Sequence, residues 1–249
     1  MEVHHHAHTA RKKWSHYFWE FLMLFLAVFC GFLAEYQLEH KIEKDREKEY
    51  IHSLLQDFEY DTLQYGKTVA KIEIKIPFYD SVLHFLKDPG VNGGKLPFRF
   101  YSQTNIEVIY QPLEPTLLQL KGSGNLRLIR KRRVLDSILI YDSRVNGNYR
   151  NQTQYVVDFN KRLIETEEKV FDNAPFNLFL NDLIQDNERP DPASYDLPIA
   201  AQNQDRLLEM HNIYINAKAT DVFYIQLLMT MKKEATKLIQ LIRKEYQIH

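Results

Sequence analysis

Apolar side chains recur at helical spacing in three long segments of the chain. Within each segment many of them fall three, four or seven residues apart, a period near 3.5 residues that lets a helix pack lengthwise against its neighbours. The positions are Ile51, Leu55, Phe58, Tyr65, Val69, Ile72, Ile76, Tyr79, Leu83 and Leu86; Leu135, Ile138, Val145, Tyr149, Val156, Phe159, Leu163 and Val170; and Met210, Ile213, Ala217, Tyr224, Leu228, Met231, Ala235, Leu238 and Ile242. We therefore predict an all-α fold, with about three long helices packed in a bundle.

Glycine and proline interrupt this pattern at a few places. Strong helix breakers between Lys87 and Gly94 are expected to end the first long helix, and Pro77 is expected to kink or divide it. Short helices are expected over residues 115–121 and 176–186.

Two further segments, 98–101 and 106–110, are rich in β-prone residues. They can pair as a small hairpin, but the loops between them and the helices are long enough to be irregular. Irregular structure is therefore the favoured interpretation.

The segment 21–34 would be apolar on every face of a helix, because it contains no charged or strongly polar side chain. Aromatic residues of the kind that lie at lipid headgroups flank it, with Trp14, Tyr17 and Trp19 before it and Tyr36 after it. As a helix, residues 17–36 would rise about 30 Å, which matches the hydrocarbon thickness of a bilayer. We predict a transmembrane helix over residues 17–36.

A cleaved signal peptide is the alternative for this segment. Ala34 is followed by Glu35 without a small-x-small cleavage site, and Phe29 before Cys30 is too large for the usual lipoprotein site. Helical patterning also continues past Tyr36. These features favour an uncleaved single-pass anchor.

The cations near the predicted span indicate its orientation. Arg11, Lys12 and Lys13 directly precede the span, whereas the cations that follow it begin only at Lys41. Cations next to a span tend to stay in the cytoplasm, and a long C-terminal segment can cross the membrane whatever its charge. We predict a cytoplasmic His-rich, basic tail (1–16), the span (17–36) and an extracytoplasmic helical bundle (37–249). This arrangement corresponds to an inner-membrane protein with most of its chain in the periplasm.

Small and polar residues share one face of the predicted span. At 100° per residue, Glu20, Ala27, Gly31 and Ala34 fall on the same side as His16. The Ala27-x-x-x-Gly31 pair lets two helix backbones approach closely, and Glu20 can hydrogen-bond across such a contact. This face is the predicted contact with a second copy or with another membrane protein. The alternative is that Glu20 extends to the headgroups and is neutralised by His16.

Histidines are concentrated at the N-terminus, at His4, His5, His6 and His8. They can offer imidazoles to Zn, Ni or Cu, although no Cys, Asp or Glu accompanies them at ligand spacing. Protonation beside anionic lipid headgroups is the alternative.

The run HHHAHTARKKWSHYFWEFLMLFLAVFCGFLAEYQLEHKIEKDREKEYI resembles the N-terminal signature of a family of uncharacterised membrane proteins common in Bacteroidota. The later segments LKGSGNLRLI and LIQLIRKEY are similar to that family too. The resemblance implies native histidines and a membrane protein, and it brings no established activity. In that lineage Asp61-Thr62-Leu63, Asp80-Ser81-Val82 and Asp136-Ser137-Ile138 resemble O-glycosylation sites of exported proteins, in agreement with the predicted topology.

The amino-acid composition indicates a folded protein and argues against a nucleic-acid partner. The chain has 249 residues, 45% of them apolar, which is enough for a packed core. Lys and Arg (32) nearly balance Asp and Glu (33), so we predict no nucleic-acid partner. The only cysteine, Cys30, excludes an intrachain disulfide.

The sequence contains no P-loop and none of the three short catalytic or metal-binding motifs considered next. The Gly122-Ser-Gly run lacks the Lys-Ser/Thr of a P-loop, and no HExxH, CxxC or GxSxG motif occurs. The run of cations at residues 130–133 is interpreted as a solvated helix face that pairs with acids. The acids proposed for this pairing are Glu165, Glu167 and Glu168. A second acidic group is also expected to be solvated, namely Asp57, Glu59 and Asp61.

These patterns predict a membrane-anchored, non-enzymatic interaction or scaffold protein without a cofactor. Its predicted partners are the lipid bilayer and either a second copy or another membrane protein. The alternatives are a sensory ligand-binding subunit and a metal-binding protein that uses the histidine cluster.

Overall fold

The computed structural model describes residues 14–185, 190–199 and 204–248, and the fold is all-α, as predicted. The histidine cluster and the three cations before the span lie outside the described residues. The helices are α1 (Trp14–Lys87), α2 (Phe98–Thr104), α3 (Pro115–Gly122), α4 (Arg132–Arg144), α5 (Arg150–Glu167), α6 (Ala174–Gln185) and α7 (Gln204–Tyr246), with the 3₁₀ turns η1 (Pro89–Asn92), η2 (Asn125–Leu128) and η4 (Pro192–Ser194) and the π-helical turn η3 (Val145–Tyr149).

The chain divides into two compact units, residues 1–51 and residues 52–249. In the first unit the described residues all belong to α1. Among the described helices, α1 is the one that is long and apolar enough to cross a membrane, and none of its apolar stretch is buried. The structure therefore contains a candidate membrane span where the sequence predicts one.

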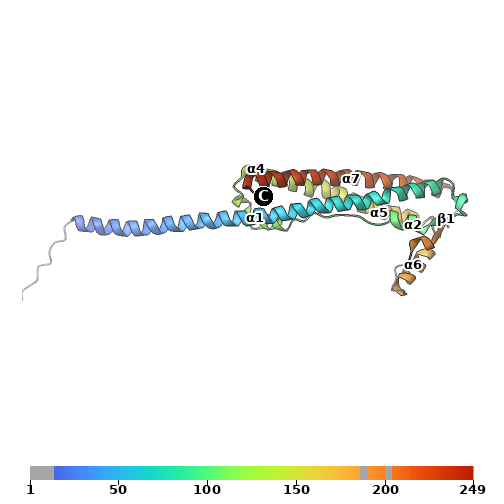
Figure 1. Cartoon of the computed structure of the whole chain (residues 1–249), viewed down its shortest axis with the longest axis horizontal. Helices are drawn as coiled ribbons and strands as arrows, with labels where there is room; N and C mark the ends of the chain where they lie inside the picture. The colour runs from blue at the N-terminus through green and yellow to red at the C-terminus, as the bar shows by residue number, and fades with distance from the viewer. Residues whose placement is uncertain (1–13, 186–189, 200–203, 249) are drawn as a thin grey trace, which may run out of the picture. The chain divides into compact units, whose positions relative to one another are not determined.

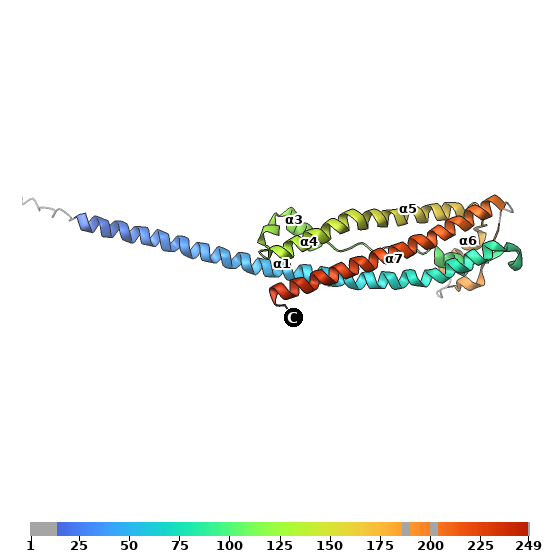
Figure 2. The ribbon, with the colours of Figure 1, turned by 90° about the horizontal axis from the view of Figure 1, so that it is seen from above.

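The second unit is a helical bundle. The later part of α1, the continuous run of α4 and α5, and α7 lie side by side as its three long rods (Figure 1 and Figure 2). The prediction of about three long helices plus short ones is therefore confirmed, as are the short helices α3 and α6.

Buried residues follow a seven-residue period along the long helices, because such a seam keeps one face of a helix against its neighbours. The buried residues of α1 form two columns with this spacing. The first consists of apolar and aromatic residues, and the second has polar or charged residues at its three central positions. The columns are Phe58, Tyr65, Ile72, Tyr79 and Leu86, and Leu54, Asp61, Thr68, Lys75 and Val82. On α7 they are Met210, Ala217, Tyr224, Met231 and Leu238, and Tyr214, Asp221, Leu228, Ala235 and Ile242.

The π-helical turn η3 lets α4 and α5 keep a single buried face. Val134 and Tyr141 are seven residues apart, as are Tyr149 and Val156, but Tyr141 and Tyr149 are eight residues apart. A π turn takes up one extra residue, so it absorbs this mismatch without breaking the helix. The face that packs on α1 and α7 therefore continues from α4 into α5.

Pro77 does not divide α1, so that part of the prediction is wrong. Proline inside a helix removes one backbone hydrogen bond and costs about 3 kcal/mol. Ile72 and Tyr79 on either side are fully buried, and packing of this kind, at about 1.5–3 kcal/mol for each apolar side chain, offsets that cost. The helix ends instead at Lys87, as predicted from the breakers that follow.

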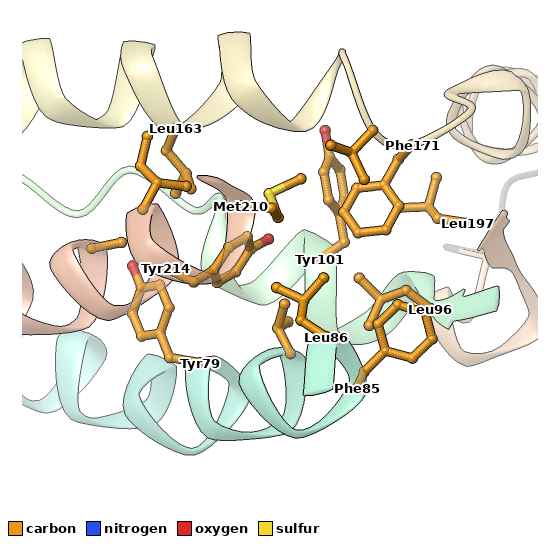
Figure 3. Close-up of a cluster of buried hydrophobic side chains, with 14 of the residues drawn as sticks. Tyr79, Phe85, Leu86, Leu96, Tyr101, Leu163, Phe171, Leu197, Met210 and Tyr214 are labelled. Carbon is orange, nitrogen blue, oxygen red and sulfur yellow. The ribbon is translucent and has the colours of Figure 1, made fainter. Parts of the chain in front are cut away.

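Segments 98–101 and 106–110 do not pair as a hairpin: the first is helical, and the second is irregular, as the favoured interpretation had it. Phe98, Tyr101 and Thr104 are all buried, and their spacing of three residues places them on one face of α2. The strands lie elsewhere: β1 (Lys95–Pro97) pairs antiparallel with β2 (Asp196–Pro198), with Leu96 opposite Leu197. Both leucines join the apolar cluster at this end of the bundle, where Leu197 lies beside Phe171 and Leu96 lies near Phe85 (Figure 3).

Candidate functional site: the α5–α7 groove and the polar core beneath it

Polar side chains occupy the middle of the bundle core in two clusters. The first, here called the Glu167 cluster, joins α1, α2, α5 and α7. Its members are Lys75, Tyr79, Thr104, Asn105, Glu167, Tyr214 and Asp221. The second, here called the tyrosine cluster, joins α1, α4, η3 and α7 to the segment between α2 and α3. Its members are Asp61, Tyr65, Tyr110, Tyr141, Tyr149 and Tyr224.

Glu167 is fully buried, and its carboxylate accepts hydrogen bonds from side chains of two other elements. Asn105 Nδ2 donates to both carboxylate oxygens, at 2.9 and 3.1 Å, and the Tyr214 hydroxyl donates to one of them. Burial raises the pKa of Glu167 to about 8, although the two donors act in the opposite direction. The folded chain therefore holds the Glu167 proton more tightly than a solvated glutamate would.

A buried ion pair forms the other end of the Glu167 cluster. Lys75 Nζ of α1 lies 2.9 Å from Asp221 Oδ2 of α7, and the Tyr79 hydroxyl donates to the same oxygen at 2.9 Å. Burial raises the pKa of Tyr79, and the charge of Asp221 raises it further. Tyr79 and Tyr214 meet edge to face at 6.1 Å between ring centroids, as Figure 3 shows, and so bring the two ends of the cluster together.

The tyrosine cluster is built around the buried carboxylate of Asp61. Asp61 Oδ1 accepts hydrogen bonds from the Leu113 amide at 2.9 Å and from the Tyr110 hydroxyl. Its Oδ2 is buried and accepts no hydrogen bond from the described residues. Burial raises the pKa of Asp61 to about 6. Hydroxyl contacts of 3.1 Å join Tyr65 to Tyr141 and Tyr149 to Tyr224.

The prediction that Asp61 is solvated is therefore wrong, and so is the prediction that Glu167 pairs with the cations at 130–133. Asp61 falls on the buried column of α1, and Glu167 is held by Asn105 and Tyr214 from other elements. The run at 130–133 does have a solvated face, but Arg132 pairs with Asp136 and Arg133 with Glu245.

The other two acids of the Asp61 group lie nearer the surface. Glu59 is exposed and pairs with Arg243 at 2.8 Å. Asp57 is half-buried, and its carboxylate accepts a hydrogen bond from the Thr116 amide at 3.3 Å.

A groove of about 1240 Å³ runs along the outside of the bundle between α5 and α7. Every residue that lines it comes from η3, α5, the turn after α5 or α7, so α1 contributes nothing to it. Four lining residues on each side recur at seven-residue spacing, and we call these two rows the groove walls. The α5 wall consists of Asn148, Tyr155, Arg162 and Lys169, and the α7 wall of Glu209, Asn216, Phe223 and Thr230.

Aromatic rings project into the groove without cover. The side chain of Phe223 is 73% exposed and that of Tyr155 is 54% exposed. The floor is formed by better-buried residues, among them Phe159 and Tyr224. Tyr224 belongs to the tyrosine cluster, so the floor of the groove is in direct contact with the polar core.

The groove walls carry balanced charge. Arg162 and Lys169 are cationic, and Glu165 and Glu209 are anionic. Five amide side chains, Asn148, Gln152, Asn212, Asn216 and Gln226, add neutral donors and acceptors. The site is therefore suited to a surface that combines apolar, amide and paired ionic groups rather than to a highly charged ligand.

The residues predicted to pack the membrane helix against a partner all lie on the exposed surface of α1. Glu20, Ala27, Gly31 and Ala34 are all exposed. Apart from the nearby backbone of its own helix, a Cβ atom added at Gly31 would have no described atom within 4 Å, which leaves room for a second helix. The histidines predicted as metal ligands lie outside the described residues. Within the described part, no group of three His, Cys, Asp or Glu side chains could hold a metal ion.

The groove was not predicted from the sequence, although its walls have a signal there. Tyr155 and Phe223 are large aromatics that fall outside the apolar core columns of their helices. Comparisons with protein-family models, with curated proteins and with solved structures found no match to this chain, so the groove and the polar core stand on their own geometry.

Proposed function

We propose that this chain is a membrane-anchored, non-enzymatic interaction protein. One span over residues 17–36 holds it in the inner membrane with its N-terminus in the cytoplasm, and the helical bundle contacts a partner protein outside the cytoplasm. The apolar stretch of α1, unburied along its whole length, supports the anchor. The resemblance to membrane proteins of Bacteroidota is consistent with this placement.

The exposed aromatic pair in the α5–α7 groove is the observation that carries the proposal. Phe223 and Tyr155 leave large apolar surfaces in water at the middle of a long, lined groove. Aromatic residues are enriched at protein interfaces, and exposed apolar patches rimmed by polar groups mark such sites. The charged and amide groups of the walls form a rim of this kind.

The buried carboxylates support a structural role rather than a catalytic one. Glu167 and Asp61 both have raised pKa values, which is a common property of catalytic acids. Neither lines the groove, however, and each is hydrogen-bonded to groups from other elements of the bundle. Their position fits cross-links that fix how the helices pack.

Site-specific photo-crosslinking in intact cells tests the proposal. A photoreactive residue at position 223 should give a discrete adduct, and mass spectrometry identifies the protein in it. When that partner protein is tagged and purified, this chain should copurify with it. The matched control is position 229, because Met229 is 52% exposed on the same helix and does not line the groove. Equal adducts at both positions, or none at 223, would contradict the proposal.

A sensory ligand-binding role is the second candidate, and the amide side chains of the groove favour it. Gln152, Asn212, Asn216 and Gln226 can orient a small polar ligand by hydrogen bonds. In that case a small molecule should raise the melting temperature of the purified chain, and Asn216→Ala should abolish the rise. Compounds that raise the melting temperature of both proteins equally would exclude the groove as their site.

A further inference from the structure

The antiparallel register of α5 and α7 sets which wall residues lie at the same level of the groove. Arg144 pairs with Glu234 at one end, and the Lys169 carbonyl accepts a hydrogen bond of 3.0 Å from Arg206 at the other. Equal steps along the two helices from the first contact bring Lys169 level with Glu209, three residues from the Arg206 that it contacts. Residues are therefore matched across the groove to within about one helical turn. The matched pairs are Asn148 with Thr230, Gln152 with Gln226, Tyr155 with Phe223, Phe159 with Ala219, Arg162 with Asn216, Glu165 with Ile213, Thr166 with Asn212, and Lys169 with Glu209.

Most of these levels combine side chains that attract one another. Gln152 and Gln226 are both amides, and Tyr155 and Phe223 are both aromatic. Lys169 and Glu209 carry opposite charges at the end of the groove.

Three levels are of a different kind. Glu165 is anionic and lies level with the apolar Ile213. Phe159 lies level with Ala219, so a large side chain is opposite a small one, as in helix packing. Arg162 and Asn216 are matched neither in charge nor in size.

We infer that the α5–α7 face binds a second copy of this chain, in a parallel dimer whose two-fold axis runs along the groove. This symmetry places α5 of one copy beside α7 of the other at the same level. Each level then meets its own counterpart: aromatic meets aromatic, amide meets amide, and Lys169 of each copy faces Glu209 of the other. The inference deepens the proposed function and rests on it, because it names the partner of the same groove.

Charge complementarity selects this arrangement over the antiparallel one. If the axis instead crossed the groove, Lys169 would meet Asn148 or Thr230, and Glu209 would lose its cation. The parallel dimer also places His52, the first residue of the bundle unit, at the same end of both copies. Both N-terminal segments then leave from one end, as two chains anchored in a single membrane require.

Charge exchange between the walls provides the test. Lys169→Glu alone places two Glu–Glu contacts in a homodimer, and Glu209→Lys alone places two Lys–Lys contacts. In a mixture of the two variants, each heterodimer regains two attractive pairs. Each single variant should raise the dimer Kd about tenfold, and the equimolar mixture should return to the wild-type value. Contacts within one chain cannot produce this rescue, so it reports contact between chains.

The measurement is sedimentation velocity of the full chain in mild detergent. All variants carry Gly31→Ile, which blocks close approach of the membrane helices and leaves the bundle as the source of association. A monomeric parent chain, single variants with unchanged Kd, or a mixture without rescue would each overturn the inference.

A second pair of variants tests the centre of the face. Phe223→Asp should raise the Kd about a hundredfold, because it puts a charge at the aromatic level. Met229→Asp should leave it unchanged, and circular dichroism should show both variants folded. An unchanged Kd for Phe223→Asp would overturn the inference. If the chain is monomeric but the crosslink at position 223 identifies a different protein, the dimer fails while the proposed function stands.

Discussion

Removing the cation of the Lys75–Asp221 pair tests whether the polar column of the core cross-links the bundle. The two side chains are only 3% and 5% exposed, and the pair joins α1 to α7. In Lys75→Met the Asp221 carboxylate keeps the hydrogen bond from Tyr79 but loses its counter-ion in a buried site. Breaking a buried ion pair in this way lowers the free energy of unfolding by about 3–5 kcal/mol.

Thermal unfolding of the full chain in mild detergent, followed by circular dichroism, measures this loss. For a unit of this size each 1 kcal/mol lowers the melting temperature by about 2–4 °C, so we expect a fall on the order of 10 °C. Lys218→Met is the matched control, because Lys218 pairs with Asp80 between the same two helices at 2.6 Å. That pair is partly exposed, with side-chain exposures of 32% and 59%. Its loss costs at most about 1 kcal/mol.

Replacing both partners of the buried pair completes the test. Lys75→Met combined with Asp221→Leu should recover most of the lost stability, because no buried charge is left without a partner. The reasoning is refuted if Lys75→Met and Lys218→Met lower the melting temperature equally. It is also refuted if the double variant is less stable than Lys75→Met alone.

Three further predictions follow from the same structure and sequence. The pKa of Glu167 is raised from 4.5 to about 8 in the folded chain, so the folded state holds the proton more tightly and the free energy of unfolding falls as pH rises from 4.5 through 8. In Glu167→Gln, melting temperatures measured over this pH range should fall less steeply with pH than in the wild type. An equal fall in both proteins would contradict the raised pKa. Titration calorimetry of a peptide with His4, His5, His6 and His8 tests the metal alternative with Zn and Ni, and no micromolar binding would remove it. A reporter fused at Gln247 should be active only outside the cytoplasm, and cytoplasmic activity would reverse the predicted topology.

The long helices were predictable because their signal is local. Tyr65, Ile72 and Tyr79 recur at the period of a packed helix, and that period is visible in the sequence without knowledge of any neighbour. The break after Lys87 has a local cause as well. The π turn η3 has a local signal too, in the eight-residue interval between Tyr141 and Tyr149.

The polar core was missed because its partners are far apart in the sequence. Tyr79 and Asp221 are 142 residues apart, and Glu167 and Asn105 are 62 residues apart. A charged residue on a helix is usually solvated, so Asp61 was assigned to the surface despite its position on the seven-residue column. Only the fold shows which donors compensate its burial.

The groove could not be predicted for a related reason. Which faces of α5 and α7 remain uncovered depends on how the long helices pack, and the sequence pattern marks only the face that packs most tightly. Phe223 and Tyr155 then resemble scattered surface aromatics until the structure places them on opposite walls of one groove. Because both side chains are exposed in one groove, together they form an apolar surface that a partner can cover.

Alkaline extraction of cell membranes tests the central claim most directly, because it separates chains that span the bilayer from those that only adhere to it. The account predicts that the full-length chain stays in the membrane pellet after carbonate washing and enters solution only with detergent. A folded, full-length chain recovered in the supernatant without detergent would contradict it.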